Sequence, residues 1–247
     1  QVVSAFMMLV MIFIILPRAI VSARRINEVL STNPKILNGT VTETAESDKG
    51  TIEFKNVSFK YPDASDYVLR NISFKAEKGK TIAFIGATGS GKSTLINLIP
   101  RFYDATDGDV LVDGVNVKEY DIESLNNKLG YVPQKAVMFS GTVSSNVAYG
   151  NNGRDNYSAD DIKQAIKIAQ GTEFVEKMEN KYEGAIAQGG SNISGGQKQR
   201  LAIARAVCRK PEIYIFDDSF SALDYKTDRV LRSELKKETA GTTTLIV

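Results

Sequence analysis

The sequence predicts an α/β fold in which a mostly parallel sheet lies beside a small N-terminal antiparallel β subdomain. Two patterns lead to this prediction. After about residue 92, short apolar strands alternate with helices, whereas strand patterns follow one another directly between residues 51 and 85. Alternating strands and helices build parallel sheets with helical crossovers. The 247 residues suffice for one such domain with an appendage.

The appendage begins with an apolar run. Between Val2 and Leu16 only Ser4 is polar, and Pro17, Arg18, Arg24 and Arg25 follow. A helix over residues 2–16 is roughly 22 Å long, against a hydrocarbon core of about 30 Å. Arginines just past an apolar run are typical of the cytoplasmic side. Residues 1–30 therefore predict the end of a transmembrane helix and its cytoplasmic extension, with a soluble amphipathic helix or a buried core helix as alternatives.

A polar segment separates this helix from the domain. Residues 31–50 are rich in Ser, Thr, Asn, Gly and Glu and predict a linker, and residues 51–247 predict one compact domain. The expected strands lie at residues 52–59, 72–74, 81–85, 110–112, 129–132, 212–216 and 243–247, the first with a local irregularity. The expected helices lie at residues 92–101, 122–128, 158–169, 196–209 and 226–239.

Composition excludes several classes of function. The net charge of +2 is too small to indicate a nucleic-acid partner. Histidine is absent, so these residues hold no histidine-based catalytic or metal site. The single cysteine, Cys208, excludes an internal disulfide, and its place in a helical pattern predicts a small buried side chain rather than a reactive thiol.

Residues 86–94, Gly-Ala-Thr-Gly-Ser-Gly-Lys-Ser-Thr, fit the phosphate-loop pattern at every fixed position. An apolar strand precedes them and an apolar-periodic helix follows, which is the setting that the motif requires. Glycines let successive N–H groups curl around an anion, the lysine reaches the terminal phosphates, and the serine hydroxyl ligates Mg²⁺. We expect the triphosphate of ATP to contact Gly86, Thr88, Gly89, Ser90, Gly91, Lys92, Ser93 and Thr94.

A second motif supplies carboxylates. Residues 213–216, Ile-Tyr-Ile-Phe, form an apolar strand that ends in Asp217 and Asp218. In phosphate-loop ATPases the first such acid holds Mg²⁺, and the next residue is placed to polarise the attacking water. We therefore expect Ser93 and Asp217 at the metal and Asp218 at the water.

Further motifs resemble those of ATP-binding cassette proteins. Asn192-Ile193-Ser194-Gly195-Gly196-Gln197 looks like the family's signature, with isoleucine for the usual leucine. Tyr61 stands where the family stacks an aromatic ring on adenine, although it could simply be a packed strand-end aromatic. Gln134 matches the Q-loop glutamine, whose family roles are contact with Mg²⁺ or water and linkage to the membrane domain, although it could simply be an exposed loop glutamine. Ser221 to Asp224 matches the D-loop. The motifs occur in family order over residues 51–247, and a membrane helix before them is the arrangement of exporters.

The resemblance implies a phosphate-loop NTPase core with a helical subdomain that carries the signature. It implies an ATPase that uses ATP and Mg²⁺, with Asp218, Gln134 and Lys92 as catalytic residues. It also implies a head-to-tail dimer, in which Ser194, Gly195, Gly196 and Gln197 contact the ATP of a second nucleotide-binding domain. The protein would be a multi-pass exporter of the cell membrane, with this domain on the cytoplasmic side. ATP-dependent closing and opening of the paired nucleotide-binding domains, which are tied to the transmembrane domains, would drive export.

Two departures qualify the resemblance. The active family pattern has glutamate where this chain has Asp218, a loss common in one subunit of heterodimeric exporters. We therefore expect tight ATP binding, slow hydrolysis and a different half-transporter as partner. A homodimer, a regulatory subunit with little hydrolysis and a non-transport cassette ATPase are the alternatives. The family's switch histidine would follow Val247, where we expect it to have been trimmed off or substituted. The cargo is not predicted, because membrane helices select it.

Overall fold

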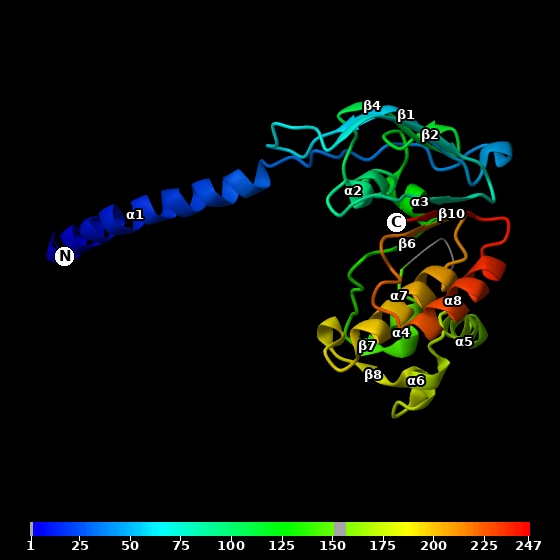
Figure 1. Ribbon diagram of the computed structural model, residues 1–247. Coiled ribbons are helices and arrows are strands. Elements are labelled where there is room, and N and C mark those ends of the chain that lie inside the picture. The colour runs from blue at the N-terminus through cyan, green and yellow to red at the C-terminus, as the bar shows by residue number, and fades with distance from the viewer. Residues whose placement is uncertain (1, 151–156) are drawn as a thin grey trace. The chain divides into compact units, whose positions relative to one another are not determined.

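The computed structural model describes residues 2–150 and 157–247. The chain divides into two compact units, Gln1–Leu37 and Asn38–Val247. The first unit consists mainly of one helix, and the second holds both sheets and the remaining helices (Figure 1).

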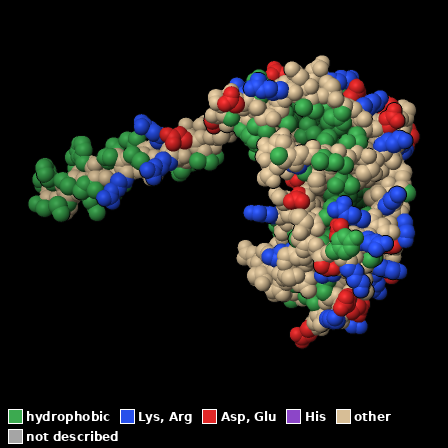
Figure 2. All heavy atoms as spheres, in the orientation of Figure 1, with side chains coloured by type: hydrophobic (Ala, Val, Ile, Leu, Met, Phe, Trp, Pro, Cys, Tyr) green, Lys and Arg blue, Asp and Glu red, His purple; other side chains and the backbone are tan. Residues whose placement is uncertain are grey.

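The N-terminal helix, α1, spans Val2–Leu30 and continues through Pro17. None of its residues is buried, and apolar side chains cover most of its N-terminal half (Figure 2). Among the described residues it is the one helix long and apolar enough to cross a membrane. The helix confirms the predicted secondary structure, while its place in a membrane stays a prediction because length and composition alone support it.

The predicted linker over residues 31–50 is shorter in the structure, because its second half packs on the compact unit. The N–H of Gly39 donates to the Tyr120 carbonyl at 2.9 Å, and Val41 forms a parallel bridge with Tyr120. A Cβ on Gly39 would collide with the backbone of Glu119 and Tyr120. The polar composition of residues 31–50 correctly predicts little regular structure, but it does not predict that residues 39–41 pack against the compact unit.

An antiparallel sheet forms the start of the compact unit, as predicted. Its strand order is β2 (Leu69–Ala76), β1 (Ile52–Phe59), β4 (Asp107–Val112) and β5 (Val115–Asn116). The expected irregularity in β1 is a register shift after Phe54, where Asn56 has a φ of 49°. Gly108 passes so close to Lys55 and Asn56 that no Cβ would fit, which explains the glycine at this crossing.

The parallel sheet follows, in the order β3 (Thr81–Ala83), β10 (Thr243–Ile246), β9 (Ile213–Phe216) and β6 (Leu129–Val132). All three pairings are parallel and without register shifts. The carboxyl ends of these strands therefore meet at one edge of the sheet, where ligands of α/β proteins bind. The predicted phosphate loop follows β3, and the predicted acidic pair follows β9.

Helices surround this sheet (Figure 1). They are α2 (Lys92–Asn97), α3 (Ile122–Asn127), α4 (Val143–Val147), α5 (Ala159–Ile168), α6 (Thr172–Glu176), α7 (Gly195–Cys208) and α8 (Tyr225–Glu238). A small hairpin pairs β7 (Gly141–Thr142) with β8 (Ala185–Ile186). Short 3₁₀ turns lie at Glu46–Asp48, Lys181–Glu183 and Gln188–Gly190.

The elements that sequence patterns missed are short. Two-residue strands and five-residue helices contain too few positions to show a period, and α4 and α6 depend on tertiary packing. The predicted helix over 92–101 ends at Asn97 instead. Pro100 explains part of this difference, because proline disfavours helical backbone in the residue before it.

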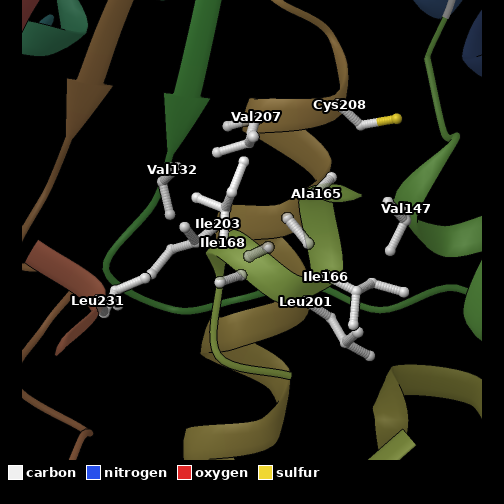
Figure 3. Packing of buried hydrophobic residues seen from close by; sticks show 14 of the residues in the cluster. Val132, Val147, Ala165, Ile166, Ile168, Leu201, Ile203, Val207, Cys208 and Leu231 are labelled. Atoms are coloured by element: carbon white, nitrogen blue, oxygen red, sulfur yellow. The ribbon is translucent and has the colours of Figure 1, made fainter. Parts of the chain in front are cut away.

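Two apolar clusters fill the compact unit. One lies between the antiparallel sheet, α2, α3 and one face of the parallel sheet, and the other joins the opposite face to α4, α5, α7 and α8. In the second cluster Val132 and Leu231 lie against Ile203 of α7, with Ala165 beside them (Figure 3). Cys208 belongs to this cluster and is 1% exposed, as predicted.

A buried lysine connects the two sheets. The ammonium of Lys128, just before β6, donates to Asp113 after β4 at 2.8 Å and to Glu212 before β9 at 3.2 Å. Asp113 is 1% exposed and also accepts from the N–H of Gly50 at 2.7 Å. Burial raises the pKa of Glu212, and the positive charge of Lys128 opposes that rise. The positive charge of Lys128 thus balances the charge of two carboxyl groups, those of Asp113 and Glu212.

We expect Lys128→Met to destabilise the compact unit by about 3–5 kcal/mol, because it leaves Asp113 buried without its cation. Urea unfolding of the detergent-solubilised protein measures this. Lys177→Met is the matched control, since Lys177 forms an exposed ion pair with Glu173 at 2.6 Å within one helical turn and should matter little. Equal stability of the two variants would contradict the expectation.

Candidate functional site

The phosphate loop connects β3 to α2 in the backbone shape that its glycines predict. Gly89 and Gly91 have φ values of 82° and 88°, in the left-handed region that favours glycine. A Cβ on Gly91 would lie 3.0 Å from Val68 and 3.1 Å from Leu69, so a larger residue has no room there. The loop is therefore an open turn with exposed backbone that an anion can approach.

Lys92, the first residue of α2, points its ammonium into this turn. Nζ donates to the carbonyls of Gly86 at 2.8 Å and Ala87 at 2.9 Å, and lies 3.4 Å from the Ser90 hydroxyl. The loop thus holds a cation within its own ring of backbone groups. Such a cation is placed to exchange these neutral acceptors for phosphate oxygens, which form stronger charge-assisted hydrogen bonds.

The predicted metal ligands Ser93 and Asp217 lie together, although 124 positions separate them. The Ser93 hydroxyl donates to Oδ1 of Asp217 at 2.7 Å. Asp217 is 5% exposed, and its N–H continues the sheet ladder by donating to Val132 at 2.9 Å. A hydroxyl and a carboxylate are hard oxygen donors that suit Mg²⁺, which keeps several waters and takes its other ligands from phosphates.

In the described part of the chain, no group of three or more Asp, Glu, Cys or His side chains could hold a metal by itself. Mg²⁺ keeps several waters and is bound through one or two protein ligands together with substrate phosphates, and the Ser93 hydroxyl and the Asp217 carboxylate are ligands of the required kind. The donor set therefore fits Mg²⁺ delivered together with a triphosphate.

The side chains of Asp218 and Gln134 are hydrogen-bonded to each other. The side-chain amide of Gln134 donates to Oδ2 of Asp218 at 3.0 Å, which joins the loop after β6 to the end of β9. Asp218 has a φ of 43°, an unusual left-handed conformation for a non-glycine residue, and is half-buried. Such backbone conformations cluster at functional sites. Its neighbour Asp217 is nearly enclosed, so the two adjacent carboxylates have different surroundings.

A cavity of about 590 Å³ brings these residues together, within the size range of small-molecule sites. Its lining is Tyr61, Val68, Thr88, Gly89, Gly91, Lys92, Ser93, Thr94, Gln134, Asp218 and Val247. Of the predicted ATP-binding residues, Gly86 and Ser90 do not line the cavity but contact Lys92. Sequence reasoning missed Val68 and Val247, because neither belongs to a recognisable motif.

Tyr61 lines this cavity and is also packed. Its hydroxyl lies 2.9 Å from that of Thr94, and its ring makes edge contacts with Phe59 at 5.0 Å and Tyr103 at 5.2 Å. These contacts show a packed aromatic, one of the two interpretations weighed from the sequence, while stacking of Tyr61 on adenine stays a prediction. The hydrogen bond attaches the aromatic ring directly to the phosphate-binding segment.

The signature motif forms the start of α7. Ser194 accepts from the N–H of Gln197 at 3.3 Å, while Gln197 accepts from the N–H of Ser194 at 2.8 Å, which makes a reciprocal cap. Ser194 and Gly195 are exposed, and a Cβ on Gly195 would meet nothing within 4 Å. A Cβ on Gly196 would lie 3.1 Å from the Ala222 carbonyl oxygen, so this glycine has less room. None of these four residues lines the cavity described above.

The D-loop residues connect the acidic pair to α8. The Ser221 hydroxyl donates to the backbone carbonyl of Asp218 at 3.0 Å. Asp224 caps α8 by accepting from the N–H of Thr227 at 3.0 Å. Hydrogen bonding with the Thr227 side chain, followed by its N–H, holds the pKa of the Asp224 carboxyl below its usual value. The D-loop thus fixes the backbone that carries Asp218.

Two further residues at the site were not predicted. The Tyr131 hydroxyl donates to the Asn97 side chain at 2.8 Å and lies 3.4 Å from Oδ2 of Asp217. The alternation of β6 could have indicated a side chain on the face of α2, but only the register between β6 and β9 places it beside Asp217.

Comparison with known proteins gives consistent results. At 44% identity over the whole chain, the sequence matches an uncharacterised ABC transporter ATP-binding protein of Mycobacterium bovis. At 42% identity over 90% of the chain, it matches an ATP-dependent lipid A-core flippase of Haemophilus influenzae. The chain spans 42% and 38% of these two relatives.

The structure is similar to that of a bacterial Atm1-family ABC exporter with ATP bound. The TM-score is 0.86 at 31% identity, over 97% of this chain and 41% of the exporter chain. The family model described as ABC transporter matches residues 69–221, more than half of the chain. These matches confirm the resemblance found from the motifs, and the chain belongs to the ABC transporter family as an ATP-binding domain of the exporter type.

Proposed function

We propose that this chain is the ATP-binding and ATP-hydrolysing motor of a membrane exporter. The observation that carries the proposal is that the glycine-rich loop, Lys92 and Ser93 lie at one cavity, and that Ser93 is hydrogen-bonded to the nearly enclosed Asp217. The phosphate loop and Asp217 are more than a hundred residues apart in the sequence. Together they supply the groups that a magnesium-bound triphosphate requires. The similar Atm1-family exporter was solved with ATP bound, which supports the same ligand here.

Each side chain has a distinct part in ATP binding. The loop from Gly86 to Thr94 offers N–H groups to the phosphates, and Lys92 exchanges its loop carbonyls for β- and γ-phosphate oxygens. Tyr61 offers its ring to the adenine. Mg²⁺, held by Ser93 and Asp217 with Gln134 nearby, would neutralise phosphate charge and orient the terminal phosphate.

Hydrolysis requires a group that orients water, and Asp218 is the candidate. Its Oδ2 accepts a hydrogen bond from Gln134 and lies at the cavity, so it is placed to accept one from water instead. Aspartate is one methylene shorter than the family's glutamate, which withdraws the carboxylate by about 1 Å, and a displacement of this size can cost about a hundredfold in rate. We infer tight binding with slow turnover at this site.

A second nucleotide-binding domain would complete the site. Ser194 and Gln197 cap the start of α7, where Ser194 and Gly195 are exposed, and the N-terminus of a helix is an anion-binding arrangement. Because these residues do not line the chain's own cavity, their phosphate would belong to a partner. With Asp218 in place of glutamate, we favour a different half-transporter subunit as that partner, and a homodimer is the alternative.

The membrane assignment follows from α1 and from the relatives. We propose that α1 ends a multi-pass transmembrane domain in the cell membrane, that the segment after Leu30 connects it to the motor, and that the motor lies on the cytoplasmic side. Arg18, Arg24 and Arg25 on α1 agree with this orientation. Closing of the paired motors around ATP would then change access across the bilayer.

One observation favours a second candidate function. Asp218 is both shorter than glutamate and already bonded to Gln134, so a subunit that binds ATP with little hydrolysis fits the same site. It would then regulate its partner by binding alone.

We expect Lys92→Ala to weaken ATP binding by roughly 10- to 100-fold, because it removes charge-assisted hydrogen bonds to phosphate. Displacement of a fluorescent ATP analogue from the purified transporter in magnesium measures this. Lys75→Ala is the matched control, since Lys75 is exposed on β2 away from the cavity. Unchanged affinity for Lys92→Ala, or no ATP binding by the unaltered protein, would contradict the proposed function.

We expect Asp218→Glu to raise ATP turnover at this site by roughly tenfold or more, because it restores the reach of the carboxylate. Single-turnover cleavage in the assembled transporter, with the partner's own catalytic acid disabled, isolates this site. Asp218→Asn should lower the residual rate and leave ATP binding intact. If glutamate brings no increase, the regulatory alternative is favoured over slow hydrolysis limited by reach.

A further inference from the structure

A tyrosine hydroxyl lies beside the carboxylate that is expected to hold the metal. Tyr131 stands on β6, and its hydroxyl lies between Asn97 at the end of α2, at 2.8 Å, and Oδ2 of Asp217 after β9, at 3.4 Å. The other oxygen of the same carboxylate, Oδ1, accepts from Ser93 at 2.7 Å. Each oxygen of Asp217 therefore faces a hydroxyl group.

The position of Tyr131 is fixed by its neighbours. It is paired in register with Ile215 of β9, and it packs against the apolar cluster that includes Leu129 and Ile215. The ring of Phe102 meets its ring edge to face, with centroids 5.5 Å apart. Since the backbone and the ring are both held, the hydroxyl has little freedom to turn away from Asp217.

The hydroxyl remains a hydrogen-bond donor under physiological conditions. A tyrosine hydroxyl is a hydrogen-bond donor at neutral pH, because the ordinary pKa of its phenol is about 10. Its single proton has two acceptors within reach, Asn97 Oδ1 and Asp217 Oδ2. Because an amide can present either oxygen or nitrogen, Asn97 can also donate to the phenol and release that proton to Asp217.

We propose that Tyr131 is a positioning residue for Asp217, whose hydroxyl sets the rotation of the carboxylate and thereby the affinity of the site for Mg²⁺. The proposal rests on the proposed function, because it takes Asp217 as the metal-holding acid. Groups that hydrogen-bond to a ligating carboxylate orient it, and their loss typically costs 10- to 100-fold in metal affinity. A purely structural role would instead need only the aromatic ring.

The test removes the hydroxyl and keeps the ring. The intact transporter carrying Tyr131→Phe is unfolded by heat with ATP in EDTA, and then with ATP over a series of Mg²⁺ concentrations. We expect the stabilisation by ATP in EDTA to be unchanged, and the Mg²⁺ concentration for half-maximal further stabilisation to rise about tenfold. Neither readout depends on ATP hydrolysis.

Tyr214→Phe is the matched control. Tyr214 is a buried tyrosine on the neighbouring strand β9, but it belongs to the apolar cluster on the opposite face of the sheet, where its ring stacks on Phe216. It should lose stability without a change in Mg²⁺ dependence. The same Mg²⁺ midpoint for Tyr131→Phe as for the unaltered protein, or an equal shift in Tyr214→Phe, overturns the proposal.

Asn97→Leu provides a second test that does not depend on the folding of Tyr131→Phe. It removes the hydroxyl's other partner, so we expect a change in Mg²⁺ midpoint of at least about twofold with ATP binding in EDTA retained. No change there also overturns the proposal. Absence of any stabilisation by ATP in the unaltered protein would instead refute the proposed function, and the role of Tyr131 with it.

Discussion

The hydrogen bond between Ser93 and Asp217 joins the two segments on which the site depends. Ser93 belongs to the start of α2, and Asp217 follows a strand that enters the sheet more than a hundred residues later. The bond can form only because β9 lies in the interior of the parallel sheet with β6 and β10 on either side. Every residue that lines the cavity from the second half of the chain is placed by that strand order.

The apolar packing supports the same geometry from both faces. The face toward α2 and the antiparallel sheet holds Ile213 and Ile215, whereas the opposite face holds Tyr214 and Phe216 against the helices. The strand before Asp217 is therefore buried on both sides, which is why it reads as a continuous apolar run. A carboxylate at the end of so rigid a strand has little positional freedom, and this suits a metal ligand.

Much of the site could be predicted because motif chemistry is local. Glycine spacing predicts a left-handed turn, and Gly89 and Gly91 adopt it. A helix over residues 196–209 was predicted, and α7 begins at Gly195, where Ser194 and Gln197 cap it reciprocally. The antiparallel and parallel sheets followed from the order of strands and helices. The packing of residues 38–50 did not, because Gly39 and Val41 contact residues about 80 positions away.

Residues that act through others were the hardest to predict. Tyr131 in isolation is an ordinary strand aromatic, and Asn97 is an ordinary residue at a helix end. Their significance arises from the register between β6 and β9 together with the helical phase of α2, which places the Tyr131 hydroxyl between Asn97 and Asp217. A short sequence motif specifies neither the register between β6 and β9 nor the helical phase of α2. The contact between Tyr131 and Asn97 is therefore visible only in the folded structure.

The contrast between Asp217 and Asp218 explains why neighbouring carboxylates can have different roles. Asp217 follows β9, continues the sheet ladder through its N–H, and has Ser93 and Tyr131 beside its carboxylate. Asp218 turns into the left-handed region and directs its carboxylate to the cavity and Gln134. The change in backbone direction between them separates a buried acid suited to hold a metal from a more accessible one suited to orient water. A shorter side chain at position 218 then alters the second role without disturbing the first, which is how a site can keep ATP affinity while its turnover falls.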